Sequence, residues 1–527
     1  MKTNIIFFIL LCAFVLNGCL EDEGSYTYAP LRAPEFGFTY PQYVYCYEKD
    51  TAKLTGKFRF IESDSVERMA NVRYEWVVNG MVLSREKDFN VPTDTIMEKL
   101  GLTEYPADGL AGSFNIIEEE SGMKYMYVIY FYIRPKFTRG QWVILSKNGG
   151  NSKLSFQQMS VKNTDTGIDT VWNNYDNIYL QNNGEEIPGS PIRLIDHAAP
   201  NISKALNATL VLTDKVAYEI NTESFKKVYD LKDQFLDGTP ENFHVVDAFH
   251  DRRITYIATQ DGRLFKRTFT ENYLGGKFIS TPYSLDTKGY DFAFFGNGAV
   301  YNWASMFLCY DKLNRRVLSI NQNSTSQGVM TVVEPSEGEH PVKIWDMDED
   351  TEVLQISQIS DVTTNWKYAG YCMIYNQGGV TYMADFVLQQ DIPFSFARLV
   401  AAPEAQKRVF PGGVMNKDTK FVIIGYGWSG PYLSSIFYTK GKELRYVNRA
   451  NDTDNPFMTF DAEITAIQYD CTSTTRRELL GIGLANGDFM RVDIKNKNNP
   501  KIIKGSRFNV GGEIVDISNT GGGHNVE

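Results

Sequence analysis

Few residues of this chain have the types and spacing that catalysis requires. None of the five histidines forms a His-Glu-x-x-His pair or lies beside a cysteine pair, as a zinc site would need. His244 and His250 flank one apolar stretch, so alternation along a strand would place both on one face, as ligand-facing residues or as polar positions at a sheet edge. The chain also lacks a Gly-x-Ser-x-Gly elbow and a dinucleotide fingerprint. We therefore expect no enzymatic activity, no metal and no cofactor.

Carboxylates are abundant, and one run of them resembles the start of a calcium loop. Asp346 to Asp350 with Glu352 could present several oxygen ligands. An EF-hand loop needs Gly at its sixth position and Glu at its twelfth, where this chain has Thr351 and Ser357. The run is therefore interpreted as a solvated acidic loop. Glycoside hydrolysis needs only two carboxylates at a suitable separation, so a glycan hydrolase or lyase stays an alternative.

Three tryptophans near loop signals are the candidate ligand contacts. Aromatic faces bind sugar rings or peptide side chains by apolar contact, and Trp303, Trp366 and Trp428 could act in this way. Packing between strands is the competing interpretation for each. Trp428 is the strongest candidate because glycines surround it in the segment 425–430.

Composition favours an all-β protein. The 527 residues include 31 Tyr and 33 Phe, β-branched runs are frequent, and long helical periodicity is absent. The net charge of −11 argues against nucleic acid as a partner, because phosphates demand Lys and Arg.

Residues 35–136 are predicted to form an immunoglobulin-like β-sandwich. Tyr74, Trp76 and Val78 share one face of a strand that ends in an Asn79-Gly80 turn, and such a tryptophan commonly fills the core. The last strand, about 124–133, is nearly continuously apolar. We expect one of its faces to meet the sandwich core and the other to meet the next domain.

Residues 138–518 are predicted to form a β-propeller-like domain of about seven blades. Hydrophobic strands recur around tight turns such as Asn148-Gly149, Asp261-Gly262 and Asn486-Gly487. Two stacked β-sandwiches are the rival arrangement. Residues 519–527 are Gly-rich and are predicted to be a disordered tail.

The cysteines predict little covalent chemistry in the body of the protein. Cys46, Cys309, Cys372 and Cys471 lie far apart, so a disulfide framework is not expected in so large a chain. They are predicted to be small buried core residues, although a bridge such as Cys309 to Cys372 stays open.

The N-terminus resembles a bacterial lipoprotein signal. Residues 1–18 combine Lys2 with an apolar run too short to span a bilayer, and Leu16-Asn17-Gly18 precedes Cys19 as in a lipobox. The resemblance implies that Cys19 is lipidated and that residues 19–34 form a tether. Glu21, Asp22 and Glu23 resemble the signal that sends lipoproteins of Bacteroidetes to the outer face of the outer membrane.

The lipobox, the acidic run, Ser25-Tyr-Thr-Tyr28 and the Tyr-x-Trp-x-Val-Asn-Gly strand together resemble the PKD-like family lipoproteins of Bacteroidetes. The resemblance implies a lipid-anchored outer-membrane protein facing the cell exterior, associated with a SusC/SusD-type nutrient importer. The first hypothesis is therefore a non-enzymatic accessory that binds or presents oligosaccharide or peptide. A propeller hydrolase or lyase and a structural adhesion scaffold are the alternatives.

Overall fold

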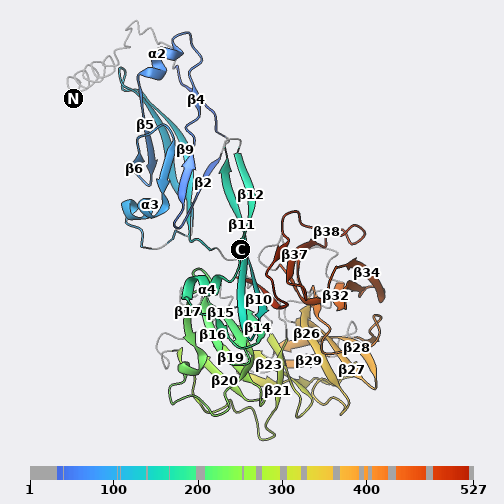
Figure 1. The fold of residues 1–527 in the computed structure, drawn as a ribbon. Coiled ribbons are helices and arrows are strands. Elements are labelled where there is room, and N and C mark those ends of the chain that lie inside the picture. The colour runs from blue at the N-terminus through green and yellow to red at the C-terminus, as the bar shows by residue number, and fades with distance from the viewer. Residues whose placement is uncertain are drawn as a thin grey trace, which may run out of the picture. The chain divides into compact units, whose positions relative to one another are not determined.

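The computed structural model describes residues 32–520 except 39–40, 104, 107, 138–140, 165–166, 197–207, 252–253, 269–275, 297–305, 322–328, 360–367, 391–396, 401–405, 425–434 and 471–478. Strands dominate the described residues and the helices are short, which confirms the all-β class (Figure 1). No helix in this part of the chain is long and apolar enough to cross a membrane. The chain divides into two units, Met1–Cys46 with Asp50–Ile133, and Tyr47–Lys49 with Arg134–Glu527.

The first unit contains one five-stranded sheet in the order β2-β9-β8-β5-β6 and two small sheets, β1-β4 and β3-β7. Its elements are β1 (Glu35–Phe36), β2 (Gln42–Tyr47), β3 (Thr51–Leu54), β4 (Phe58–Arg59), α2 (Ser65–Ala70), β5 (Val72–Val78), β6 (Met81–Ser84), β7 (Phe89–Pro92), α3 (Thr93–Leu100), β8 (Leu110–Glu118) and β9 (Lys124–Arg134).

The expected core tryptophan is confirmed. Trp76 on β5 is fully buried, its ring centroid lies 4.4 Å from that of Phe114, and its Nε1 donates to the carbonyl of Glu86. The β5–β6 turn contains Asn79 and Gly80, both at positive φ, as a tight hairpin requires.

The last strand of this unit, β9, has one buried face and one partly exposed face. The inward side chains of β9, among them Ile129 and Phe131, are buried in the core. On the other face Met126 is 61% exposed and Val128 is 38% exposed. That this face meets the next domain stays a prediction. Tyrosines occur on both faces of β9 and hide its period-two alternation, which is why the strand reads as continuously apolar.

The second unit contains seven antiparallel sheets among its described residues, here called sheets I to VII. The strand named first is called the first strand of its sheet: sheet I contains β40 (Ile514–Thr520), β10 (Gln141–Asn148), β11 (Asn151–Thr164), β12 (Gly167–Tyr175) and the short β13 (Ile187–Pro188), sheet II contains β14 (Pro191–Asp196), β15 (Ala208–Thr213), β16 (Ala217–Asn221) and β17 (Lys227–Asp230), and sheet III contains β18 (Val245–Asp251), β19 (Ile254–Thr259) and β20 (Leu264–Thr268). Sheet IV contains β21 (Phe292–Phe295), β22 (Met306–Asp311), β23 (Arg316–Asn321) and β24 (Met330–Val332), and sheet V contains β26 (Glu352–Ile359), β27 (Tyr368–Gln377), β28 (Val380–Gln390), β29 (Ala397–Val400), β30 (Gln406–Val409) and β25 (Glu334–Pro335), which pairs with β29 in parallel. Sheet VI contains β31 (Phe421–Ile423), β32 (Ser435–Lys440), β33 (Glu443–Asn448) and β34 (Thr453–Thr459), and sheet VII contains β35 (Ile464–Tyr469), β36 (Leu479–Leu484), β37 (Asp488–Asp493), β38 (Lys501–Ile502) and β39 (Phe508–Asn509). The helix α4 (Ile178–Asn183) lies between β12 and β13 of sheet I, and a 3₁₀ helix (Leu231–Gln234) follows the last strand of sheet II.

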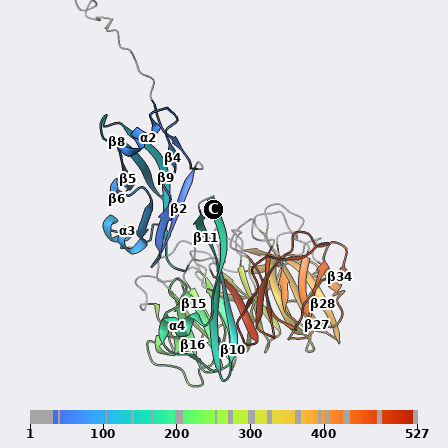
Figure 2. The ribbon, with the colours of Figure 1, turned by 45° about the horizontal axis from the view of Figure 1, so that its top comes forward.

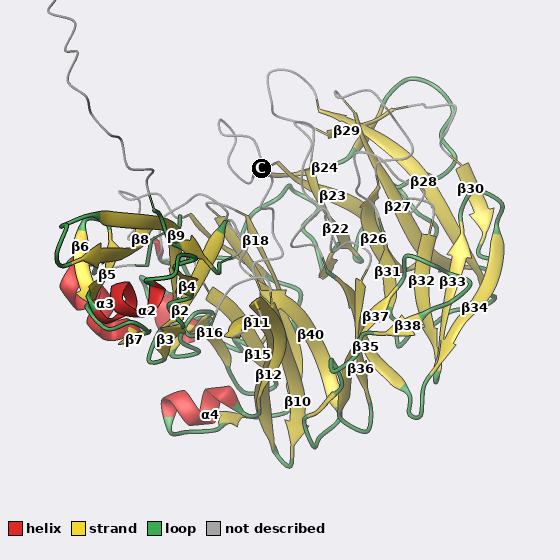
Figure 3. Cartoon of the chain, turned by 90° about the horizontal axis from the view of Figure 1, so that it is seen from above, coloured by secondary structure: helices red, strands yellow, loops and turns green. Residues whose placement is uncertain are grey.

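The seven sheets follow one another in a closed series. β14 contacts β18, β18 contacts β21, β22 contacts β26, β26 contacts β31, β31 contacts β35, β35 contacts β40, and β40 contacts β14 (Figure 3). A separate cluster of buried apolar side chains lies between each neighbouring pair of sheets. The C-terminal strand β40 closes the series, because it pairs with β10 from Gln141 to Ser146. This strand ends at Thr520, so the first two residues of the expected tail belong to a sheet.

The cysteines behave as expected where the structure describes them. Cys46, Cys309 and Cys372 are free and buried, and burial raises the pKa of each thiol. The open possibility of a bridge from Cys309 to Cys372 is therefore excluded. Cys471 lies outside the described residues.

Candidate functional site at the inner edge of the sheets

The first strands of six sheets share one irregularity. Each contains one extra residue relative to the second strand, near its N-terminal end, which is the pattern of a β-bulge. The extra residues are Ile192, Val246, Ala293, Leu354, Thr465 and Val515. Because bulges re-aim the side chains beside them, the residue after each bulge marks an equivalent position in each sheet.

The equivalent positions are charged in three consecutive sheets. They hold Asp516 in sheet I, Arg193 in sheet II and Asp247 in sheet III. The corresponding residues of sheets IV, V and VII are uncharged: Phe294, Gln355 and Ala466. At the inner edge of the series, the charged positions among these six sheets therefore lie in three consecutive sheets.

The two aspartates make the same hydrogen bonds. One carboxylate oxygen of Asp247 accepts from the backbone N–H of Ala248 at 2.9 Å, and the other accepts from Phe295 of the next sheet at 3.0 Å. Asp516 repeats the arrangement, with Ile517 at 2.9 Å and Leu194 of the next sheet at 2.9 Å. Each carboxylate thus joins its own first strand to the first strand of the following sheet.

Arg193 lies between the two carboxylates. Its Nη1 is 2.5 Å from an oxygen of Asp247, and its charge also interacts with Asp516. The carboxylate of Asp247 is 4% exposed, whereas the side chain of Arg193 is 33% exposed. Of this pair, Arg193 therefore has the more exposed side chain to offer a ligand.

The electrostatics reflect this burial. Burial, the largest effect, raises the pKa of Asp247 and of Asp516, and Arg193 opposes the shift in both. Lys420, directly before β31, also opposes the shift at Asp516. Burial alone would lower the pKa of Arg193, but the attraction of Asp247 and then of Asp516 outweighs it and raises that pKa.

This arrangement suits a structural role for the two carboxylates better than a catalytic one. A general acid or nucleophile must reach a substrate, but both oxygens of each carboxylate already accept backbone amides. Arg193 is different, because a guanidinium presents five N–H donors and can bind hydroxyl or carboxylate oxygens while it pairs with Asp247.

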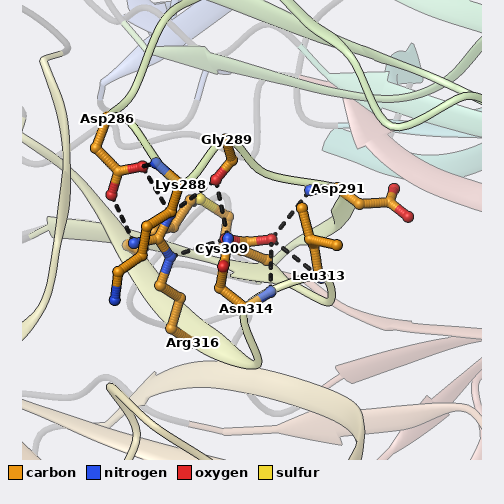
Figure 4. Close-up of polar contacts among 10 residues, drawn as sticks. Asp286, Lys288, Gly289, Asp291, Cys309, Leu313, Asn314 and Arg316 are labelled. Atoms are coloured by element: carbon orange, nitrogen blue, oxygen red, sulfur yellow. Dashed lines mark hydrogen bonds and ion pairs between the residues drawn. The ribbon is translucent and has the colours of Figure 1, made fainter.

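A second cluster of one arginine and two aspartates lies at the β22–β23 hairpin of sheet IV (Figure 4). Asp311 is fully buried and accepts from Arg316 Nε at 2.8 Å and from the backbone N–H groups of Asp291 and Leu313. Arg316 Nη1 donates to Asp286 at 2.6 Å, and this hydrogen bond, the largest effect, lowers the pKa of Asp286. Here the charges brace one hairpin against the segment before it.

The predicted lipidation, export-signal and tryptophan ligand-contact residues all lie outside the described residues. They are Cys19, Glu21, Asp22, Glu23, Trp303, Trp366 and Trp428. The strands that flank the tryptophans are described, however. Trp303 falls between β21 and β22, Trp366 between β26 and β27, and Trp428 between β31 and β32.

The acidic loop is solvated, as expected. Asp348 and Asp350 are exposed, and a carboxylate oxygen of Asp350 accepts from the backbone N–H of Gly378 at 2.6 Å. Among the residues that the structure describes, no group of three or more His, Cys, Asp or Glu side chains could hold a metal ion.

Sequence reasoning missed Arg193, Asp247 and Asp516. A signal for the aspartates is present in the sequence, because Val245-Val-Asp-Ala248 and Ile514-Val-Asp-Ile517 share an apolar-Val-Asp-apolar pattern. Arg193 has no such signal, since its role depends on the two neighbouring sheets.

Comparison with known proteins supports the N-terminal resemblance. Residues 19–191 match the model of the PKD-like family, so the resemblance to that family is confirmed for this part of the chain. The match passes the expected domain boundary at 136 and includes β10 to β13 of sheet I. No curated protein matches the chain.

Several solved structures resemble the chain at a distance. A quinonprotein alcohol dehydrogenase-like protein from Bacteroides thetaiotaomicron has 10% identity and a TM-score of 0.33, with 92% of this chain and 95% of that chain covered. Dihydro-heme d1 dehydrogenase NirN has 9% identity and a TM-score of 0.37, with 74% and 77% covered. Hsv2p of Kluyveromyces lactis has 11% identity and a TM-score of 0.34, with 69% and 94% covered. Likenesses this weak say nothing about what the chain does.

Proposed function

We propose that the second unit is a seven-bladed β-propeller and that the protein is a non-enzymatic surface lipoprotein that uses it as a binding platform. The platform would take up oligosaccharide or peptide as an accessory of a SusC/SusD-type nutrient importer. Support for the propeller comes from the closed series of seven sheets and from the apolar cluster between each neighbouring pair. In this architecture each sheet is one blade and its first strand lies nearest the axis.

The observation that carries the binding role is the position of three tryptophans. Trp303, Trp366 and Trp428 fall in the connection between the first and second strands of sheets IV, V and VI, which are consecutive. Because the blades of a propeller repeat one strand order, equivalent connections leave from the same face of the ring. Three aromatic side chains in equivalent connections suit a ligand that binds by stacking.

The anchor is proposed from the N-terminus. Diacylglyceryl and acyl chains on Cys19 would hold the protein stably in a membrane, because each buried CH₂ contributes about 0.8 kcal/mol. The acidic residues Glu21, Asp22 and Glu23 would direct it to the outer face of the outer membrane. Cys19→Ala should release the protein from the membrane fraction of the native cell.

The binding role is tested with the full mature chain. We expect at least one member of a panel of oligosaccharides and peptides to bind, and a triple variant with Trp303, Trp366 and Trp428 changed to Ala to lose that binding. Crosslinking in the native membrane should capture an importer of the SusC/SusD type. Failure of both experiments would contradict the proposal and leave a structural adhesion scaffold as the better account.

A propeller hydrolase or lyase is the second candidate. Asp247 and Asp516 both lie near Arg193, and a raised pKa is what a general acid needs. Their backbone hydrogen bonds argue against this role. Cleavage of any glycan in the panel that Asp247→Asn abolishes, while the variant stays folded, would establish it.

A further inference from the structure

Lys497 lies in the connection between β37 and β38, the third and fourth strands of sheet VII. Because these strands are antiparallel, the connection after the third strand leaves from the same end of the sheet as the connection after the first. Lys497 therefore belongs to the same face of the series as the three tryptophan connections. Sheets VI and VII, coloured from orange to dark red, are neighbours in this series (Figure 2).

The ammonium of Lys497 reaches across to sheet VI. Its Nζ donates a hydrogen bond to Oγ of Ser435, the first residue of β32, and lies 5.1 Å from the ring centroid of Tyr446 on β33. Ser435 is fully buried and directly follows the connection in which Trp428 lies. The Ser435 hydroxyl and the Tyr446 ring therefore hold the ammonium beside the end of that connection.

The ammonium of Lys497 has no carboxylate partner in the part of the chain that the structure describes. The side chain is partly buried, and burial lowers its pKa with no carboxylate to oppose the shift. Ser435 accepts one of the three N–H donors of the ammonium, so the others remain for a ligand. A bound anion would compensate the positive charge that burial leaves poorly solvated.

Two described carboxylates near this position are turned away or already paired. The residues on either side of Asp493 pack between sheets VI and VII, so alternation turns Asp493 toward the other side of sheet VII. Asp452, in the β33–β34 connection of sheet VI, pairs with Arg408 of sheet V at 2.6 Å. In the sequence, residues 424–434 between β31 and β32 contain no charged residue, and residues 471–478 between β35 and β36 contain two arginines and one glutamate. The surroundings of the ammonium therefore favour an anion.

We propose that Lys497 makes the platform selective for an acidic oligosaccharide, whose carboxylate or sulfate group it binds; this inference rests on the proposed binding role of the tryptophan connections. A lysine ammonium is a compact point charge, so it pairs with either anion. An acidic sugar carries its charge on the same ring that offers a C–H face to an aromatic side chain, so one sugar residue can satisfy both contacts. An acidic peptide carries its charges on side chains that have no flat face for stacking.

The test uses the full mature chain and titration calorimetry with hexasaccharides of galacturonate, mannuronate and sulfated galactose, together with a neutral glucose hexasaccharide and a hexaglutamate peptide. We expect at least one acidic hexasaccharide to bind, and Lys497→Met to weaken its binding at least tenfold and to reduce the salt dependence of the affinity. Lys497→Arg should keep most of the affinity because the charge survives. Lys440→Met, at an exposed lysine at the opposite end of β32 from Ser435, is the matched control and should leave the affinity unchanged. Melting temperatures check that each variant stays folded.

The outcomes separate the role of Lys497 from that of the tryptophans. Binding of an acidic hexasaccharide that Lys497→Met loses and the triple tryptophan variant keeps supports the role of Lys497, even though the tryptophans fail their own test. Binding of the neutral hexasaccharide that the tryptophan variant loses and Lys497→Met keeps, with no acidic hexasaccharide bound, upholds the platform and overturns its selectivity for acidic sugars. Acidic hexasaccharide binding that Lys497→Met leaves intact also overturns it, as does binding of hexaglutamate alone.

Discussion

The second unit contains two clusters of one arginine and two aspartates, and the pKa values of their carboxyl groups are shifted in opposite directions. At the β22–β23 hairpin, Arg316 joins Asp311 and Asp286, which come from a single sheet and the segment before it. At the inner edge, Arg193 lies between Asp247 and Asp516, and the three residues belong to three different sheets. The pKa of Asp286 is lowered by its arginine, while burial raises the pKa of Asp247 and of Asp516.

The difference teaches how position decides what a charge does. Asp286 is 31% exposed, so solvent still helps to stabilise its charge and the arginine adds to that. The inner carboxylates have lost most of their solvent, and the backbone amides of neighbouring first strands replace it. The hairpin cluster braces a local turn, whereas the inner cluster joins consecutive sheets.

The largest expected effect comes from removing the strand that carries Asp516. Truncation after Glu513 deletes β40, which pairs with β10 and packs between sheets VII and II. The series of sheets would then be open, with the pairing edge of β10 exposed, and we expect no cooperative thermal unfolding of the second unit. Truncation after Thr520 keeps β40 and should leave the melting temperature unchanged, so a shift there would contradict the role assigned to the strand.

Matched alanine variants compare the two clusters directly. Asp247→Ala leaves two buried backbone N–H groups and Arg193 without their acceptor, and we expect a loss of about 3 kcal/mol in unfolding free energy. Asp286→Ala leaves Arg316 paired with Asp311 and should cost no more than about 1 kcal/mol. Urea denaturation of both variants measures the difference. Equal losses of unfolding free energy would show that the inner carboxylate contributes no more to stability than the hairpin carboxylate.

Sequence patterns can indicate the cluster at the β22–β23 hairpin but not the cluster at the inner edge. Turns such as Asn79-Gly80 and the buried Trp76 follow from short-range patterns, and these predictions are confirmed. Asp311 is likewise followed closely by the hairpin residues that it binds, Asn314 and Arg316.

By contrast, Arg193 meets its partners only after the sheets have closed, and the pairing of β40 with β10 joins the two ends of the second unit. A bulge adds one residue to a strand and leaves its composition ordinary, so the shared first-strand geometry has no clear sequence signature. The alternation of β9 was hidden for a related reason, since tyrosine suits buried and exposed positions alike.

The pH dependence of stability should have opposite signs in the two clusters. A carboxyl with a lowered pKa stabilises above its unfolded pKa and loses that contribution as pH falls, so the advantage of the wild type over Asp286→Asn should shrink in acid. A carboxyl with a raised pKa contributes most below its unfolded pKa and loses the contribution as pH rises. The advantage over Asp247→Asn should therefore shrink toward neutral pH.

Melting temperatures of the wild type and both variants between pH 3 and pH 8 check the two pH dependences. The difference in unfolding free energy between wild type and variant should change by on the order of 1 kcal/mol for each unit of pKa shift. The groups facing the inner carboxyls are Arg193 for both and Lys420 for Asp516. Parallel slopes for the two variants would mean that burial does not distinguish the clusters.

The smallest effect concerns whether the inner cluster acts as one unit of three residues. Arg193 touches Asp247 but acts on Asp516 only through its charge. Double-mutant cycles with Arg193→Met should give a coupling of about 1.5 kcal/mol with Asp247→Asn and about 0.5 kcal/mol with Asp516→Asn. A coupling indistinguishable from zero for Asp516 would reduce the cluster to one ion pair. The second carboxylate would then serve only to bind the backbone of the next sheet.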